Sequence, residues 1–370
     1  MTVICSIIAK NYVAHARVLT ESFLSKHPDG KCYVLVIDDF EGYIDPSAEK
    51  FELVRFEQLD IPNPRSLCFK YTVTELATAV KARLLQYLTQ CCNVDRLLYL
   101  DPDIFVTGSL QPLFDILGQC PLVLTPHLDH EYPEDGRYPN DESILVAGMF
   151  NLGFAGISSG EWSRRFLRWL DGKLMVDCVV DPARGHFVDQ RFFDLAFAIF
   201  PDIYIERSVA YNVAYWNLHS RYLQSKDGIW WCNGYPLRFF HFSDYKPGRG
   251  SVISGHSIRH SLDDRPDIVP LFREYDERLS ANGYAEAKKW PYGYGRFADG
   301  SAVTDAIRRE YRMSLQQNGV LEDPFADPAW ARKSSRLELR KKLDSCAERW
   351  QENLWRLGGK VSRTLKIYHA

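Results

Sequence analysis

The strongest constraint on the fold of this chain is the alternation of short apolar runs with helix-like patterns in its first third. Apolar runs at residues 2–9, 32–37 and 97–100 are bounded by turn residues and predict buried strands. Between them, residues 13–26 and 72–90 place apolar side chains three or four positions apart, which predicts amphipathic helices. Because strands that alternate with helices form sheets covered on both faces, the pattern predicts an α/β fold.

The remainder of the chain has a less regular pattern. Residues 127–143 are polar, acidic and contain proline, which predicts a long loop of the kind that forms lids and binding loops. Further strands and helices are expected at residues 121–125, 149–157, 161–170, 189–200 and 237–242.

Composition is typical of a soluble globular protein with one large domain or two. The chain has 370 residues, of which 46% are hydrophobic and 25% charged. Its nine cysteines are scattered without zinc-ligand spacing, which predicts free thiols in a reducing compartment. Residues 2–9 lack the basic start and the length of a signal peptide, and no apolar stretch has the length of a membrane span. We therefore expect a cytoplasmic protein, and no nucleic-acid partner.

The last 40 residues differ from the rest in charge. Residues 331–370 carry eleven Lys and Arg against four Asp and Glu, a net charge of +7, which leaves about −10 for the first 330 residues of a chain whose total is −3. The segment predicts a basic amphipathic helix. This helix either binds peripherally to the anionic inner face of a membrane or packs on its own domain. Its apolar stripe consists of Leu343, Ala347, Trp350, Leu354, Leu357 and Val361.

Two carboxylates mark the end of the strand expected at residues 97–100. Asp101 and Asp103 follow this apolar run, at the edge where open α/β sheets bind their ligands. Mg²⁺ and Mn²⁺ prefer a few carboxylate oxygens together with the phosphates of a substrate. The motif predicts a nucleotide-diphosphate site bridged by a metal. Its alternative is a solvated loop capped by the two carboxylates, because Pro102 is a good turn former.

Three further segments place polar groups beside apolar runs. Asn151 lies inside an apolar strand, Asp189 and Gln190 begin a helix, and His241 follows an aromatic run, with Lys246 in the turn after it. Each segment alone has a structural explanation, namely a satisfied amide, a helix cap and a core histidine.

Taken together and in this order, the four segments resemble those of the GT-A-fold nucleotide-sugar glycosyltransferases, in particular bacterial family 8-like enzymes. The resemblance runs from about residue 3 to residue 247. It implies a Rossmann-like, nucleotide-sugar-binding mixed sheet with helices on both faces, and a C-terminal helical extension. The implied domains are a GT-A domain at 1–265, with a nucleotide-binding half at 1–110 and an acceptor and donor-sugar half at 111–265, an extension at 266–330, and the basic helix at 331–370.

The resemblance also implies roles for individual residues. Asp101, Asp103 and His241 would bind Mn²⁺ or Mg²⁺, with Asp101 also near the donor ribose, and Lys246 would contact the donor diphosphate. Residues implied to line the donor sugar are Asn151 and the catalytic candidates Asp189 and Gln190. Residues implied to hold the uracil, ribose and phosphates are Ser6, Lys10, Asn11, Tyr12, Lys81 and Arg83.

The implied activity is metal-dependent transfer of a sugar from a nucleotide-diphosphate donor, expected to be UDP-linked, to a glycan or lipid-linked acceptor in polysaccharide biosynthesis, with retention. One alternative is a haloacid-dehalogenase-like phosphatase with Asp101 as nucleophile, although that motif has Thr or Val where this chain has Phe105. Another is a non-catalytic protein that binds sugar nucleotides on the same fold. The intact set of Asp101, Asp103, His241 and Lys246 favours the enzyme.

Overall fold

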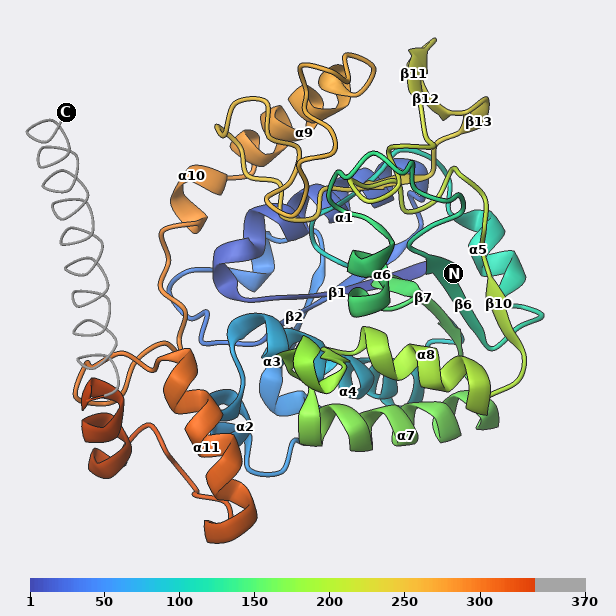
Figure 1. Ribbon diagram of the computed structural model, residues 1–370. Helices are drawn as coiled ribbons and strands as arrows, with labels where there is room; N and C mark the ends of the chain where they lie inside the picture. Colours follow the sequence, from blue (N-terminus) through green and yellow to red (C-terminus); the bar gives the residue numbers. More distant parts are fainter. Residues whose placement is uncertain (337–370) are drawn as a thin grey trace, which may run out of the picture. The chain divides into compact units, whose positions relative to one another are not determined.

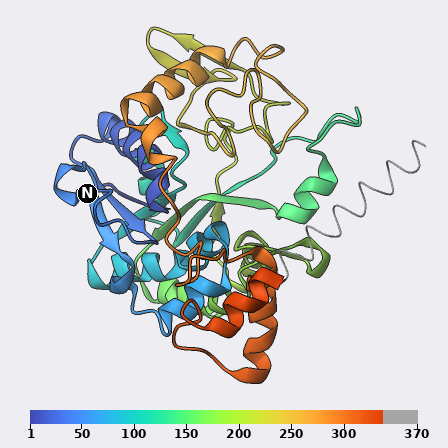
Figure 2. The ribbon, with the colours of Figure 1, turned by 90° about the vertical axis from the view of Figure 1, so that its left-hand side faces the viewer.

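The computed structural model describes residues 1–336, which fall into two compact units. The first unit comprises Met1–Ile61 and Val73–Tyr292, and the second comprises Pro62–Thr72 and the described residues from Gly293 onward. We expected the first domain to end at residue 265. The first unit continues beyond it because α9 (Val269–Ala281) packs against α1 (Val13–Lys26), and the two helices lie side by side in Figures 1 and 2.

A seven-stranded mixed sheet forms the core of the first unit (Figure 1). β7 (Phe150–Ser158) runs antiparallel to both neighbours, β4 (Arg96–Leu100) and β6 (Leu122–Pro126), whereas the other pairings are parallel. The expected mixed sheet is therefore confirmed, and β7 is buried along nearly its whole length, as its apolar sequence predicts. The strand order is β10 (Ile203–Ile205), β6, β7, β4, β1 (Val3–Ile8), β2 (Lys31–Val36) and β3 (Glu52–Arg55).

Helices cover both faces of this sheet, which confirms the second part of the fold prediction (Figure 1). α1 lies on one face, and its apolar side packs on β1 and β2. The opposite face is covered by α3 (Val73–Ala79), α4 (Lys81–Gln86), α7 (Glu161–Asp177) and α8 (Gln190–Ile199). Shorter helices of this unit are α5 (Gln111–Ile116), α6 (Asp141–Ala147) and α10 (Tyr284–Ala287).

The helix expected over residues 72–90 is not continuous, which corrects that prediction. α3 ends at Ala79, α4 begins at Lys81, and Tyr87–Cys91 form a π-helical turn. Val80 separates the first two pieces, with φ −88° and ψ 1°. Directly after the break, the Lys81 ammonium contacts a carbonyl of β7 and a carboxylate at the start of α8. Hydrophobic periodicity does not reveal such a break, because the apolar spacing continues through Val80.

A short antiparallel ladder connects two distant parts of the sequence. β5 (Ile104–Val106) pairs with β14 (Phe239–His241), so that Ile104 lies opposite His241. The backbone N–H of Phe242 also donates to the carbonyl of Asp103 over 2.9 Å. This pairing brings the residue that ends β14 to the carboxylates that follow β4. The other small strands are β8 (Val180–Asp181), β9 (His186–Phe187), β11 (Leu223–Lys226), β12 (Ile229–Cys232) and β13 (Tyr235–Pro236).

The second unit is helical in its described part. α2 (Pro64–Lys70) and α11 (Asp305–Asn318) pack together, and the hydroxyls of Ser66 and Tyr311 lie 2.8 Å apart. The buried guanidinium of Arg308 donates to the carbonyls of Cys68, Phe69 and Tyr71. The expected helical extension is thus present, whereas most of the basic segment at 331–370 lies outside the described residues.

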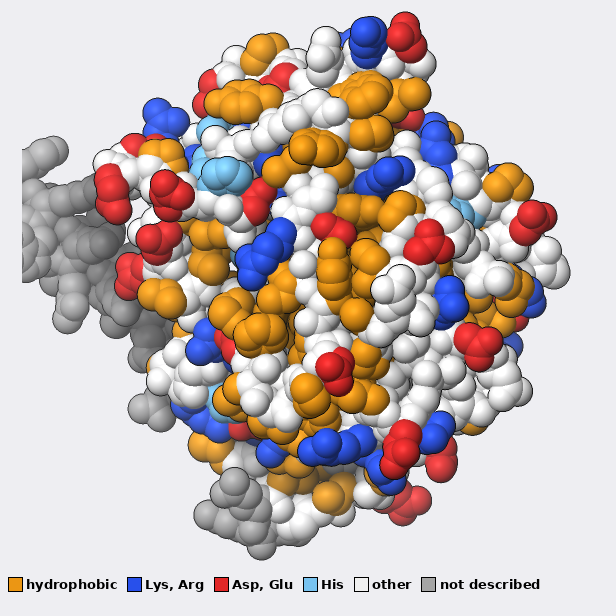
Figure 3. Space-filling view, turned by 90° about the vertical axis from the view of Figure 1, so that its right-hand side faces the viewer, with side chains coloured by type: hydrophobic (Ala, Val, Ile, Leu, Met, Phe, Trp, Pro, Cys, Tyr) orange, Lys and Arg blue, Asp and Glu red, His pale blue; other side chains and the backbone are white. Residues whose placement is uncertain are grey.

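Hydrophobic side chains gather across the middle of the face shown in Figure 3. α6 and α8 are adjacent, since Arg191 of α8 donates to the carbonyl of Leu145 in α6. Both helices carry exposed apolar side chains. Their large exposed hydrophobic residues are Leu145, Val146, Leu195, Phe197 and Ile199. Within residues 1–336, no helix combines the length and the apolar character needed to cross a bilayer.

Candidate metal and donor site

Asp101, Asp103 and His241 converge at the carboxyl edge of the sheet. Nε2 of His241 lies 3.1 Å from Oδ1 of Asp103 and 3.8 Å from Oδ2 of Asp101, and all three residues offer ligand atoms within 4.8 Å of one another. The carboxylate side chains are 33% and 21% exposed, whereas the imidazole is only 3% exposed. A ligand from solvent therefore reaches the two carboxylates first, with the histidine behind them.

Charge at this cluster is set by burial and by the mutual attraction of its members. Burial raises the pKa of Asp101, and the nearby Lys81 and His241 offset only part of this effect. Burial also opposes ionisation of Asp103, but the attraction of His241 outweighs it, so the pKa of Asp103 is lowered. The same attraction, against the effect of burial, raises the pKa of His241.

The donor set fits a divalent cation of the Mn²⁺ or Mg²⁺ type. Two carboxylates supply the oxygen ligands that these ions prefer, and the imidazole adds a nitrogen that suits Mn²⁺ better than Mg²⁺. The hydroxyl of Tyr99 donates to Oδ1 of Asp101 over 2.6 Å and the backbone N–H of Asp101 donates to the carbonyl of Gly153 over 2.7 Å. These bonds hold one carboxylate in place, as the groups around a metal ligand commonly do.

Asn151 and Gln190 lie close together where β7 meets the start of α8. Oε1 of Gln190 accepts from the backbone N–H of Leu152 over 3.2 Å and lies 3.4 Å from Nδ2 of Asn151. Nε2 of Gln190 donates to the carbonyl of Ala147 over 2.9 Å. The first residue of α8 is thereby fixed against β7, and the expectation that both amides line the donor sugar stays a prediction.

Asp189 is joined to Lys81 by a buried ion pair. Nζ of Lys81 lies 2.6 Å from Oδ2 of Asp189 and donates to the carbonyl of Leu152 over 2.8 Å, and both charged side chains are less than 5% exposed. Burial raises the pKa of Asp189, and the attraction of Lys81 offsets this in part. Lys81 therefore holds the carboxylate of Asp189 at the start of α8. Its expected contact with a donor phosphate stays a prediction.

Arg83 does not join the site, which corrects the expectation that it reaches the donor. Its guanidinium donates to Oδ1 of Asp171 in α7 and to the carbonyl of Asp60. Because two residues along a helix are separated by about 200°, Arg83 points away from the side of α4 that carries Lys81.

The residues of the first strand and its loop that were expected to hold the nucleotide differ in burial and in their contacts. Ser6 is buried within β1 and Asn11 is partly exposed. Lys10 is buried and directs its ammonium to the carboxylate of Asp38 and the carbonyl of Asp39, so it joins the loops after β1 and β2. Tyr12 is 42% exposed, which leaves a ring face for a ligand.

The ring of Tyr12 is supported from inside the protein. It stacks on His15 with centroids 4.6 Å apart, and His15 meets Tyr284 of α10 edge to face. Burial, with a smaller contribution from Asp103, raises the pKa of Tyr12 to about 12, and burial lowers the pKa of His15 to about 4. Both rings are therefore uncharged near neutral pH.

Lys246 lies in the turn after β14, as expected. Its ammonium is 2.8 Å from Oδ1 of Asp244, and its side chain is 43% exposed. It stays accessible for a ligand with negative charge.

Several contacts around the site were not predicted from the sequence. Tyr99 and Asn212 contact the metal-ligand candidates directly, and buried His127 lies 3.4 Å from Nδ2 of Asn151. Tyr99 lies in an apolar run, where an aromatic residue gives no functional signal. Asn212 adopts a left-handed conformation with φ 50°, for which asparagine is favoured, but a lone asparagine does not identify its partner.

A buried arginine contacts the second half of the long polar loop expected at residues 127–143. The guanidinium of Arg259 donates to the carboxylate of Asp135 and to the carbonyls of Arg137 and Pro139, each within 3.0 Å. The loop ends earlier than expected, because Asn140 and Ser143 form a reciprocal cap that begins α6 at Asp141.

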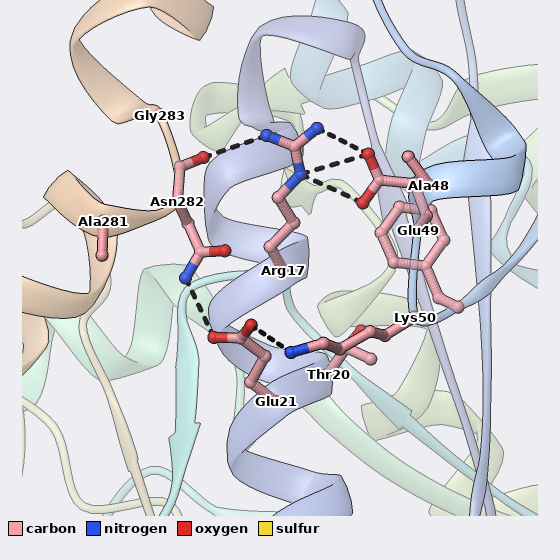
Figure 4. Close-up of a pocket in the computed structure, with 10 residues that line it drawn as sticks. Arg17, Thr20, Glu21, Ala48, Glu49, Lys50, Ala281, Asn282 and Gly283 are labelled. Atoms are coloured by element: carbon pink, nitrogen blue, oxygen red, sulfur yellow. Dashed lines mark hydrogen bonds and ion pairs between the residues drawn. The ribbon is translucent and has the colours of Figure 1, made fainter.

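A cavity of about 330 Å³ lies between α1, the segment before β3 and the turn after α9 (Figure 4). Its charged groups are already paired within the first unit. Arg17 donates to Glu49 and to the carbonyl of Asn282, and Glu21 accepts from Lys50 and Asn282. We interpret these bonds as a link between α1 and the end of α9.

Residues 3–215 match the sequence profile of glycosyl transferase family 8, which is more than half of the chain. The chain belongs to glycosyl transferase family 8. It is accordingly a glycosyltransferase, and the family match sets aside the phosphatase and the non-catalytic alternatives. The matched residues include Asp101, Asp103, Asn151, Asp189 and Gln190, whereas His241 and Lys246 follow them in the sequence.

Individual proteins similar to this family 8 member include one sequence relative and two solved structures. Uncharacterized protein YfnF of Bacillus subtilis (strain 168) is 24% identical over 280 residues, which cover 74% of this chain and 90% of YfnF. The galactosyltransferase LgtC, solved with donor and acceptor sugar analogues, is 17% identical with a TM-score of 0.47, over 76% of this chain and 96% of LgtC. The glycosyltransferase GlyE of Streptococcus pneumoniae TIGR4 is 15% identical with a TM-score of 0.44, over 80% of this chain and 67% of GlyE.

Proposed function

We propose that this family 8 enzyme transfers a sugar from a UDP-linked donor to a glycan or glycolipid acceptor in polysaccharide biosynthesis, with a divalent cation and with retention at the anomeric carbon. The observation that carries the proposal is the cluster of Asp101, Asp103 and His241 at the carboxyl edge of the sheet. Two accessible carboxylates backed by an imidazole are suited to hold a cation that also binds a diphosphate.

Mn²⁺, or Mg²⁺ in its place, would be held by these three side chains. Once bound, the cation supplies positive charge against the diphosphate as it leaves the sugar. Lys246 follows His241 by five residues and its side chain is accessible, and we propose that its ammonium binds the same diphosphate. Tyr12, with its exposed ring supported by His15, is proposed to stack on the base.

We propose that the donor sugar lies against Asn151 and Gln190. The hydrogen bonds of Gln190 to β7 and to Ala147 fix its amide before a substrate binds, so little ordering is required on binding. Asp189 contributes differently, because its carboxylate is already paired with Lys81. We assign Gln190 to the face of the reacting sugar and Asp189 to the positioning of Gln190 at the start of α8.

The remaining part of the proposal concerns location. We propose that the enzyme works in the cytoplasm, and that the basic segment at 331–370 keeps it near a lipid-linked acceptor at the membrane surface. The support is the net charge of +7 in that segment, since cationic segments are attracted to anionic lipid surfaces.

Thermal unfolding with nucleotides tests the donor class. The protein is heated with UDP, GDP, CMP or dTDP, each with Mn²⁺ and with EDTA. A ligand at about 100 times its Kd adds roughly 2.7 kcal/mol to the free energy of unfolding, which raises the Tm by several degrees. We expect this shift for UDP with Mn²⁺ only, and its loss in Asp103→Ala.

Asp263→Ala is the matched control, because Asp263 is an exposed carboxylate remote from β4 in sequence. It should keep the full shift. A UDP shift that persists in EDTA and in Asp103→Ala would contradict the metal site, and a shift with another nucleotide would replace UDP in the proposal.

A further inference from the structure

A chain of buried amide groups leads from the sugar side of the site to the candidate metal ligand His241. Its central member is Asn212, which is 1% exposed. Nδ2 of Asn212 donates to Oγ1 of Thr125 over 2.8 Å and to Oδ1 of Asn151 over 3.1 Å, and its Oδ1 lies 3.3 Å from Nδ1 of His241. Asn212 is thus the group that faces the imidazole on the side away from the carboxylates.

The orientation of the Asn212 amide follows from a backbone donor. The N–H of Gly153 donates to Oδ1 of Asn151 over 3.1 Å, which identifies that atom as the oxygen. An oxygen of Asn151 requires a donor opposite it, so the Asn212 atom that faces it is the NH₂ group. The oxygen of Asn212 consequently faces Nδ1 of His241.

This orientation decides which nitrogen of His241 carries a proton when the ring is neutral. An amide oxygen only accepts hydrogen bonds, so Nδ1 is the protonated nitrogen and Nε2 keeps its lone pair. Nε2 is the nitrogen that lies 3.1 Å from Asp103 and 3.8 Å from Asp101, where the cation would bind. A histidine that binds a metal through one nitrogen usually donates its other N–H to a protein acceptor.

We propose that Asn212 is a positioning residue that holds His241 in the tautomer that presents Nε2 to the divalent cation. The inference rests on the proposed metal site. It also identifies a physical link between the metal and the donor sugar, because the same amide binds Asn151. The position of Asn212 is itself fixed, since its carbonyl accepts from Nδ2 of Asn217 over 3.0 Å.

The binding of Mn²⁺ alone, measured by electron paramagnetic resonance of the free ion, tests the proposal without substrate turnover. Asn212→Gly removes the acceptor and tolerates the left-handed backbone of φ 50°. We expect it to raise the Kd for Mn²⁺ by about 10–100-fold, as for other groups that orient a metal ligand. Asn212→Asp tolerates the same backbone and keeps an oxygen toward Nδ1. Burial favours its protonated acid, whose hydroxyl still donates toward Oδ1 of Asn151, so we expect a Kd within about threefold of wild type.

Thr125→Val is the matched control. It removes the hydrogen bond between Thr125 and Nδ2 of Asn212 but leaves the bond of Asn212 to His241, and we expect the Kd for Mn²⁺ to stay within about threefold. Equal weakening in Asn212→Gly and Asn212→Asp would overturn the proposal, because it would show a packing role. Unchanged binding in Asn212→Gly would also overturn it and leave the metal site standing, whereas a wild-type protein that binds no Mn²⁺ would overturn both.

A second measurement uses only the wild-type protein and does not depend on the folding of a variant. The ¹⁵N shifts of labelled histidine, recorded with diamagnetic Mg²⁺, separate a ring protonated at Nδ1 from one protonated at Nε2. We expect His241, assigned by comparison with His241→Gln, to carry its proton at Nδ1. A proton at Nε2 would overturn the proposal.

Discussion

At the residue scale, Gly153 leaves no room for a side chain beside His241. A Cβ at Gly153 would lie 2.3 Å from Cε1 of His241 and 2.8 Å from its Nδ1. We expect Gly153→Ala to displace the imidazole from Asp103 and to abolish the Mn²⁺-dependent increase in Tm with UDP. Gly172→Ala is the control, because a Cβ there meets nothing within 4 Å. If Gly153→Ala kept the full Tm increase, the close approach of β7 to His241 would not matter for the site.

The buried pair of Lys81 and Asp189 predicts a large effect on stability. Lys81→Met leaves the carboxylate of Asp189 buried without its partner, which costs about 3–5 kcal/mol of the free energy of unfolding. The control, Lys31→Met, removes an exposed ion pair with Glu52 and should cost at most about 1 kcal/mol. Urea unfolding of both variants at neutral pH measures the difference. Equal costs would show that the buried pair gives no more stability than a surface pair.

The raised pKa of His241 predicts a dependence of stability on pH in the metal-free protein. In the folded state this pKa lies above the unfolded value of about 6.5. The stability from protonated His241 is therefore complete below about pH 6.5 and is lost as the pH rises through the folded value. In EDTA, the free energy of unfolding of the wild type should fall more steeply above about pH 6.5 than that of His241→Gln. Parallel pH curves for the two proteins would contradict the shift.

Individual residues also show what the sequence could and could not predict. Asp101 and Asp103 follow an unbroken apolar strand, so their place at the sheet edge was predictable from local pattern. His241 is distant in sequence and reaches them only through the pairing of β14 with β5, which the family resemblance supplied and periodicity did not. Arg83 was included because it lies on the helix before the two carboxylates, but a place on that helix does not fix which way a side chain points, and Arg83 pairs with Asp171.

At the scale of elements, α1, α8 and most strands of the large sheet were predicted to within a residue or two, whereas α7 continues to Asp177, seven residues beyond the expected end at residue 170. α1 begins and ends where its apolar spacing does, whereas α4 is separated from α3 by a break at Val80, through which the apolar spacing continues. α6 was missed because its seven residues include no buried side chain, so it has no apolar face to detect. Its capping residues, Asn140 and Ser143, were the only local signal.

The loop that precedes α6 gives a prediction at the same scale. Arg259→Met removes three hydrogen bonds from a buried guanidinium, each worth about 1.5–3 kcal/mol. The loss of even one such bond increases the open population of the loop about tenfold. Trypsin should therefore cleave after Arg137 at least tenfold faster in this variant. Arg278→Met, which removes a surface pair with Glu274, is the control and should leave this rate unchanged. An unchanged rate in Arg259→Met would show that other contacts hold the loop.

At the scale of the whole molecule, the distribution of charge separates the tail from the catalytic unit. The first 330 residues carry about −10, which repels an anionic lipid surface, while residues 331–370 carry +7. Attraction of the enzyme to such a surface therefore depends on the tail, since the remaining charge opposes it. This asymmetry can be read from the sequence alone.

Charge reversal in the full chain separates these two partners. Each Lys or Arg near an anionic surface contributes about 1 kcal/mol, so Arg340→Glu, Lys341→Glu and Lys342→Glu together should weaken sedimentation with phosphatidylserine vesicles at least a hundredfold. The control carries the same change of charge at Lys31, Lys50 and Arg55, exposed residues of the first unit, and should sediment nearly as the wild type does. Equal loss in both proteins would mean that net charge, not the tail, governs binding. No sedimentation of the wild type would favour a tail that packs on its own domain, and the acceptor would then have to be reached without a membrane anchor.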